Sequence, residues 1–191
     1  MQAGRIVVLN GVPRAGKSSI AAAIQETFEG AWLNLGVDVA MQATPPRYRP
    51  GLGLRPGEPD HVAASVVPVL YASWYESIAA HSRLGLNVVA DFGHYDAAIL
   101  TDCARRLDGL PAFFVGVRCP IDVIIERRAQ TGKPTALAPV ELWQERVHLP
   151  GIYDLEVDTS LLSPGECAAA IRRRLDEAAP SAFRQLALLK A

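Results

Sequence analysis

The sequence predicts an α/β protein with three layers, in which a parallel β-sheet of about five strands is flanked by helices. Two observations predict this fold class. Apolar runs of strand length alternate with longer amphipathic segments, which is the order of βαβ units. The runs are apolar throughout, as in strands that are covered on both faces. The length of 191 residues is typical of one domain, so we expect a single domain over residues 1–191.

The strands are expected where short apolar runs occur, beginning with the run RIVVLN near the N-terminus. Their expected ranges are 5–10, 31–37, 87–92, 112–118 and 155–159. Helical periodicity predicts helices between them and after the last one. Gly30 and Gly85 are placed to end two of these helices, and Pro120 is placed to open another. The expected helical ranges are 17–28, 61–84, 96–107, 120–130, 141–148, 164–178 and a tail within 181–191.

The composition excludes several classes of protein. Half of the residues are apolar, a fifth are charged and the formal net charge is −1, so neither a disordered chain nor a protein that coats nucleic acid is expected. No stretch reaches the roughly 18 apolar residues that a membrane span needs, and no leader pattern is seen. Cys103, Cys119 and Cys167 are expected to be reduced core thiols. We expect a cytoplasmic protein without membrane or nucleic-acid partners, and homo-oligomerisation stays open.

The motif G-x-x-x-x-G-K-[ST] lies between the first expected strand and the following helix. In this context it predicts a loop whose backbone N–H groups and helix N-terminus hold phosphate groups. Lys17, expected to be accessible, is predicted to reach the β- and γ-phosphates, and Ser18 to bind Mg²⁺. Arg14 either adds charge near the phosphates or is solvated. The residues expected to bind ATP are Gly11, Val12, Pro13, Arg14, Ala15, Gly16, Lys17, Ser18 and Ser19.

Two aspartates are expected at the carboxyl ends of strands, on the same sheet edge as the phosphate-binding loop. Asp38 is the candidate general base that takes a proton from an attacking hydroxyl group. The alternative is that Asp38 only caps the following helix. Asp91 follows the apolar run Val-Val-Ala and is expected to support the metal, or alternatively to act as a second base.

Two further segments are candidates for covering the site. Arg128 and Lys133 lie in or near a Gly- and Pro-containing stretch, and a lid over about 127–148 would bring such cations onto the transferred phosphoryl group. The alternative for each is a solvated position. Residues 44–60 contain five prolines, so we expect an irregular, exposed loop that shapes the acceptor side of the site.

With these segments placed, the chain resembles the chloramphenicol phosphotransferase family of P-loop kinases. The resemblance rests on segments that span most of the chain: VLNG leading into AGKS, WL, GVD, VGVRC and YDLEVDT. It implies a P-loop kinase fold, ATP as phosphoryl donor, and a primary hydroxyl group of an antibiotic as acceptor. It also implies that Asp38 is the base. The Pro-rich loop and the pair Asp91-Phe92 differ from the family pattern, which leaves the acceptor open.

Three functions are therefore considered from the sequence. The first is an ATP-dependent O-phosphotransferase that acts on an antibiotic such as chloramphenicol, or on a related small metabolite. The second is a nucleoside, nucleotide or shikimate-type metabolite kinase. The third is a nucleotide-dependent switch that transfers no phosphate. No water-positioning residue or partner surface is recognisable in the sequence, which counts against the third function. The first function is favoured, and an acceptor panel would separate it from the second.

Overall fold

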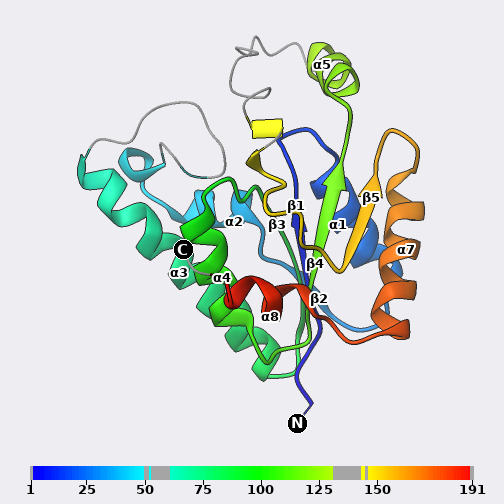
Figure 1. The fold of residues 1–191 in the computed structure, drawn as a ribbon, viewed down its shortest axis with the longest axis horizontal. Helices are drawn as coiled ribbons and strands as arrows, with labels where there is room; N and C mark the ends of the chain where they lie inside the picture. The colour runs from blue at the N-terminus through cyan, green and yellow to red at the C-terminus, as the bar shows by residue number, and fades with distance from the viewer. Residues whose placement is uncertain (1, 50–51, 53–60, 131–142, 145, 190–191) are drawn as a thin grey trace.

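A computed structural model of the chain describes residues 2–49, 52, 61–130, 143–144 and 146–189. The described residues form a five-stranded parallel sheet with the order β2-β3-β1-β4-β5, as the alternating pattern predicts (Figure 1). The strands are β1 Ile6–Asn10, β2 Trp32–Asn34, β3 Asn87–Phe92, β4 Ala112–Arg118 and β5 Leu155–Asp158. The helices are α1 Lys17–Thr27, α2 Val37–Ala43, the 3₁₀ turn η1 Pro46–Tyr48, α3 His61–Arg83, α4 Ala97–Leu107, α5 Ile121–Ala129, α7 Pro164–Glu177 and α8 Ala182–Ala187.

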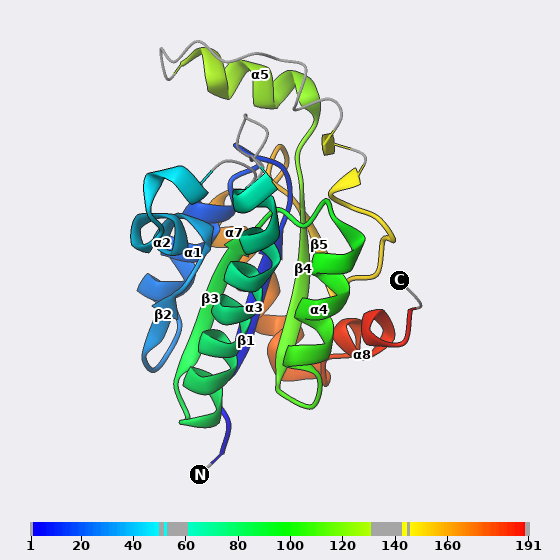
Figure 2. The ribbon, with the colours of Figure 1, turned by 90° about the vertical axis from the view of Figure 1, so that its left-hand side faces the viewer.

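The helices cover both faces of the sheet. Helices α1 and α7 pack together on one face, and α3, α4 and α8 form the layer on the other (Figures 1 and 2). Side chains of a strand point to alternate faces, so Val7 and Leu9 enter the core under α1 and α7, whereas Ile6 and Val8 enter the core under α3 and α4. This double burial explains why the strands are apolar throughout.

The second strand is shorter than the sequence predicts. The range 31–37 was expected to be extended, but β2 ends at Asn34 and a helix begins at Val37. The side chain of Asn34 accepts a hydrogen bond from the backbone of Gly36, and this local bond turns the chain out of the sheet. Asp38 therefore lies in the first turn of α2 rather than in a loop after a strand.

The other strands and helices that the structure describes begin and end within two residues of their expected bounds, apart from the tail helix, which is shorter than its expected range. The tail helix is confirmed as α8, and Cys103, Cys119 and Cys167 are buried and free, as predicted. The expected helix at 141–148 lies partly outside the described residues. No helix among the described residues is both long and apolar enough to cross a membrane.

Candidate active site

The phosphate-binding loop connects β1 to α1 at the carboxyl edge of the sheet. Two of its residues have left-handed backbones, Gly16 with φ 94° and Arg14 with φ 70°. A residue other than glycine held there costs about 1–3 kcal/mol and is typical of functional loops. A side chain at Gly11 would place its Cβ 2.5 Å from the carbonyl oxygen of Val117, so only glycine allows the loop to lie this close to β4. Within the loop, Val12 and Ala15 are buried, and Ser19 in the first turn of α1 is exposed.

Lys17 is folded back into the loop. Its Nζ donates hydrogen bonds to the carbonyl oxygens of Gly11 at 2.8 Å and Val12 at 2.9 Å. The residue is only 9% exposed, which corrects the expectation of an accessible side chain. Burial lowers the pKa of Lys17 to about 8, while the nearby carboxylates of Asp91 and Asp38 act in the opposite direction. The loop thus holds a buried ammonium group beside two carboxylates, and burial is the larger influence on its pKa.

Ser18 and Asp91 form the candidate metal position. The hydroxyl of Ser18 donates a hydrogen bond to Oδ2 of Asp91 at 2.7 Å, and Asp91 is 5% exposed at the end of β3. Hydroxyl and carboxylate oxygens are the hard donors that Mg²⁺ prefers, and protein sites for Mg²⁺ often use only one or two such groups together with substrate phosphates. Among the described residues, no three His, Cys, Asp or Glu side chains gather around a metal position. The pair therefore fits a Mg²⁺ that is shared with a nucleotide.

Asp38 lies near this pair although its secondary structure differs from the prediction. It is exposed in the first turn of α2, and its charge acts on Lys17. The turn is held close because Gly36 packs directly on Asp91: a Cβ at Gly36 would lie 1.7 Å from Oδ1 of Asp91. The N-cap of α2 is Gly36, so Asp38 does not occupy the capping position that the alternative supposed. As an acidic residue in the first turn it interacts favourably with the helix dipole, which is compatible with a catalytic role.

Arg127 secures the outer side of the loop. Its guanidinium group donates to the hydroxyl of Thr159 at 3.0 Å and to the Thr159 carbonyl at 2.7 Å. The Thr159 hydroxyl in turn donates to the carbonyl oxygen of Ala15 at 2.8 Å. Arg128 lies in the same last turn of α5 and is partly buried. Lys133 lies outside the described residues, so its expected position over the phosphates stays a prediction.

The beginning of the Pro-rich stretch is more ordered than the sequence predicts. Thr44 is buried, a 3₁₀ turn follows it, and the guanidinium of Arg47 lies 4.7 Å from the ring centre of Tyr48. Leu52 is fully buried in the core under α3. The expectation of exposure is therefore wrong for Thr44 and Leu52, and that of an irregular chain is wrong for the turn Pro46–Tyr48, whereas residues 45–47 are exposed as expected. Positions 50–51 and 53–60 lie outside the description.

A set of buried polar residues beside the loop was not predicted as functional. Asn10, the last residue of β1, donates from Nδ2 to the carbonyl of Val147 at 2.7 Å and to the hydroxyl of Tyr153 at 2.9 Å. Two histidines belong to the same set: the backbone N–H of His94 donates to Asn10, and His148 contacts Tyr153. The available signal was Asn10 itself, a polar residue in an otherwise apolar strand, because a buried amide requires partners.

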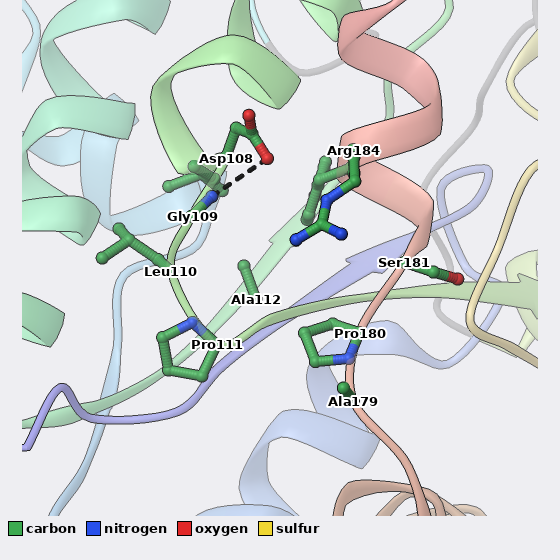
Figure 3. Close-up of a pocket in the computed structure, with 11 residues that line it drawn as sticks. Asp108, Gly109, Leu110, Pro111, Ala112, Ala179, Pro180, Ser181 and Arg184 are labelled. Carbon is green, nitrogen blue, oxygen red and sulfur yellow. Dashed lines mark hydrogen bonds between the residues drawn. The ribbon is translucent and has the colours of Figure 1, made fainter.

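A separate cavity lies at the opposite edge of the sheet. It has a volume of about 300 Å³ and opens between the end of α4 and the beginning of α8 (Figure 3). Its apolar lining residues include Leu107, Pro111 and Phe183. Asp108 and Arg184 also line it (Figure 3). The side chain of Asp108 accepts a hydrogen bond from the backbone N–H of Gly109. The cavity is next to the start of β4, whereas the phosphate-binding loop follows the end of β1, so it is not part of the candidate active site.

Proteins that are similar to this chain in sequence or in fold include phosphotransferases and kinases. The chain is 27% identical over 208 residues to proteins of two Mycobacterium tuberculosis strains that carry an O-phosphotransferase name, covering 97% of this chain and 89% of theirs. The fold is similar to the Deinococcus radiodurans tunicamycin resistance protein, with a TM-score of 0.67, 19% identity and coverage of 93% and 99% of the two chains. It is also similar to the Mycobacterium tuberculosis APS kinase CysC, with a TM-score of 0.65, 16% identity and coverage of 93% and 100%.

These structural likenesses establish the P-loop kinase fold, and the sequence carries the family assignment. The sequence model of a protein family, described as chloramphenicol phosphotransferase-like protein, matches residues 4–176. This range includes the phosphate-binding loop, Asp38, Asp91 and all five strands. The chain therefore belongs to the chloramphenicol phosphotransferase-like family and is an enzyme of the kinase class.

Proposed function

We propose that this protein transfers the γ-phosphoryl group of ATP to a hydroxyl group of a small molecule. The observation that carries the proposal is the convergence of Lys17, the Ser18–Asp91 pair and Asp38 at one edge of the sheet. Phosphoryl transfer requires positioned positive charge, a metal site and a group that accepts the proton of the nucleophile. Residues suited to each role are present within one site.

The roles of the residues follow from their chemistry. Lys17 offers an ammonium group inside a loop of backbone N–H donors, so it neutralises phosphate oxygens. Mg²⁺, when held by Ser18 and Asp91, supplies further positive charge to the phosphates. Asp38 is exposed toward solvent and accepts the proton of the acceptor hydroxyl. The acceptor oxygen forms the new bond to the γ-phosphorus, the bond from that phosphorus to the bridging oxygen breaks, and ADP leaves.

The acceptor side is proposed to lie between α2, the turn at Pro46–Tyr48 and the N-terminal part of α3. Loops that leave the carboxyl ends of strands border the ligand crevice in open α/β sheets. Arg47 is exposed and Tyr48 is half-buried there, and they offer a cation and an aromatic ring. The family name supports an antibiotic such as chloramphenicol, or a related metabolite, as acceptor; nucleosides and shikimate-type metabolites are the alternatives.

The test is phosphoryl transfer from γ-labelled ATP by the purified protein to a panel of chloramphenicol, nucleosides, nucleotides and shikimate, with products identified by mass spectrometry. We expect one class to gain a single phosphoryl group on a hydroxyl oxygen, in a reaction that needs Mg²⁺. Lys17→Ala is expected to remove transfer. Transfer by this variant at the wild-type rate would contradict the assignment of the phosphate-binding loop.

A further inference from the structure

One buried amide joins three distant parts of the chain next to the phosphate-binding loop. Asn10 is completely buried. Its Nδ2 donates to Val147 and Tyr153, and its Oδ1 accepts from the backbone N–H of His94 at 2.8 Å. Nδ1 of His94 lies 3.3 Å from the same Oδ1. All four hydrogen-bonding positions of the amide are therefore used, which no other side chain of this size can do.

These contacts fix the protonation of the neighbouring histidine. Oδ1 of Asn10 can only accept, so Nδ1 of His94 carries the proton. Nε2 then accepts from the hydroxyl of Tyr75, which lies 2.8 Å away. His94 is thereby held as a neutral imidazole, and burial together with the charge of Lys17 lowers its pKa to about 3.

The hydrogen bonds continue on the other side of the amide. The hydroxyl of Tyr153 lies 2.9 Å from Nδ1 of His148. Burial, Arg118 and Lys17 lower the pKa of His148 to about 4. The ring of Tyr153 packs on Gly116, where a Cβ would be 2.9 Å from the ring, and on Phe114 with ring centres 4.8 Å apart. Packing therefore holds the ring of Tyr153 in place, and its hydroxyl group makes the hydrogen bonds to Asn10 and His148.

The network borders the charge at the centre of the site. Lys17 influences both histidines, so its ammonium group is within electrostatic reach of each. Gly11 directly follows Asn10, and its carbonyl oxygen is one of the two that hold Lys17. The position of the Gly11 carbonyl therefore depends on the backbone of Asn10, and the network holds the side chain of Asn10 in place.

We propose that Tyr153 is a positioning residue, which acts through Asn10 on the Gly11 carbonyl and so sets the affinity of the phosphate-binding loop for nucleotide. The proposal rests on the proposed function only in taking the loop as the nucleotide site. It implies that the segment from Val147 to Tyr153 and the loop are energetically coupled, because a change at one reaches the other through the Asn10 amide.

The test is Tyr153→Phe, which keeps the ring and removes only the hydroxyl. The dissociation constant of a non-hydrolysable ATP analogue is measured by titration calorimetry with Mg²⁺. We expect affinity to fall by about 3- to 10-fold, the equivalent of one neutral buried hydrogen bond. Asn10→Ser is expected to weaken binding as well, and the double variant to bind no more weakly than Asn10→Ser alone, because both changes break the same connection.

Ser82→Ala is the matched control. The Ser82 hydroxyl is buried and donates to the carbonyl of Gly4 at 2.6 Å, on the chain just before the other end of β1. This variant is expected to lose stability while binding the analogue like the wild type. If Tyr153→Phe is destabilised to the same degree and also binds like the wild type, the hydroxyl is purely structural and the proposal fails. A wild-type protein that does not bind the analogue would instead contradict the proposed function.

Discussion

Ser18 and Asp91 are joined by a 2.7 Å hydrogen bond that links the first turn of α1 to the end of β3. The two residues are 73 positions apart in the chain, and they meet because β1 and β3 are adjacent and in register, with Leu9 opposite Asp91. The candidate metal position is therefore a product of the sheet order, since another strand between β1 and β3 would separate the pair by about 5 Å more.

Asp91→Asn is expected to reduce turnover by about 10²- to 10³-fold, because an amide oxygen carries no charge to hold Mg²⁺. Steady-state rates measured over a range of Mg²⁺ concentrations check this. The half-saturating Mg²⁺ concentration should rise in the variant. Asp176→Asn removes a carboxylate of an exposed ion pair with Arg5 and should leave the Mg²⁺ dependence unaltered; an unchanged dependence in Asp91→Asn as well would contradict the metal role.

Nucleotide affinity is expected to fall as the pH rises through about 8, where the free protein loses the charge on Lys17. The sign follows from the lowered pKa. Below this pH the ammonium group is already charged, and above it binding must take up a proton, so affinity falls by up to about tenfold per pH unit. Calorimetric titrations from pH 6.5 to 9.5 in two buffers with different ionisation enthalpies report both the fall in affinity and the proton uptake on binding. Lys17→Met should bind weakly at every pH and lose the alkaline decline.

Asp38→Asn is expected to lower kcat by about 10²- to 10⁴-fold if the carboxylate is the base. The Asp38 charge also raises the pKa of Lys17, so the alkaline decline in nucleotide affinity should begin at lower pH in the variant. Rates at saturating ATP and affinities between pH 6.5 and 9.5 check both statements.

A purely structural role of Asp38 in the first turn of α2 gives a different pattern. An acidic residue in a first helical turn contributes about 0.3–1 kcal/mol, so a purely structural Asp38 would show a small loss of Tm with kcat retained. Measuring thermal unfolding and kcat on the same preparation separates the two roles.

Gly36→Ala is expected to reduce turnover by more than about tenfold, because its Cβ would lie 1.7 Å from the Asp91 carboxylate and this overlap must displace either the metal ligand or the turn that carries Asp38. The effect should appear in the Mg²⁺ dependence as well as in kcat. Gly165→Ala is the control, since a Cβ there meets nothing within 4 Å. In helix α7 that change should stabilise the protein by up to about 1 kcal/mol with full activity.

Asp154→Ala is expected to destabilise the protein by about 2–4 kcal/mol without a direct effect on chemistry. The Asp154 side chain is fully buried. It accepts hydrogen bonds from the backbone N–H groups of Phe114, Ser181 and Ala182, and the variant leaves these three donors without an acceptor. Urea unfolding measures the loss, and rates per folded molecule should equal those of the wild type.

The strands and the phosphate-binding loop could be predicted from the sequence because their signals are local. An apolar run and the spacing of Gly11, Gly16 and Lys17 require no knowledge of the rest of the chain. Helix α2 could not be predicted in the same way. Its first residues, Val37, Asp38 and Val39, are poor helix formers, and the helix forms where Gly36 packs against Asp91 from another strand.

The same reason explains the missed polar network. Asn10 meets its partners across 84 to 143 residues of chain, and such pairings depend on the topology of the sheet rather than on spacing. Lys17 was expected at the surface because a phosphate ligand must be reachable, but its ammonium group donates to the loop's own carbonyl oxygens. A buried charged group requires such partners, and only the folded loop supplies them.

The central position of β1 has a consequence for motion. All five of its residues pair with β3 on one side and with β4 on the other, and all are buried. Opening this strand requires the separation of both halves of the sheet, so its amides should exchange with solvent only through the largest unfolding events. The base of the phosphate-binding loop, which β1 carries, is therefore the most rigid part of the candidate site.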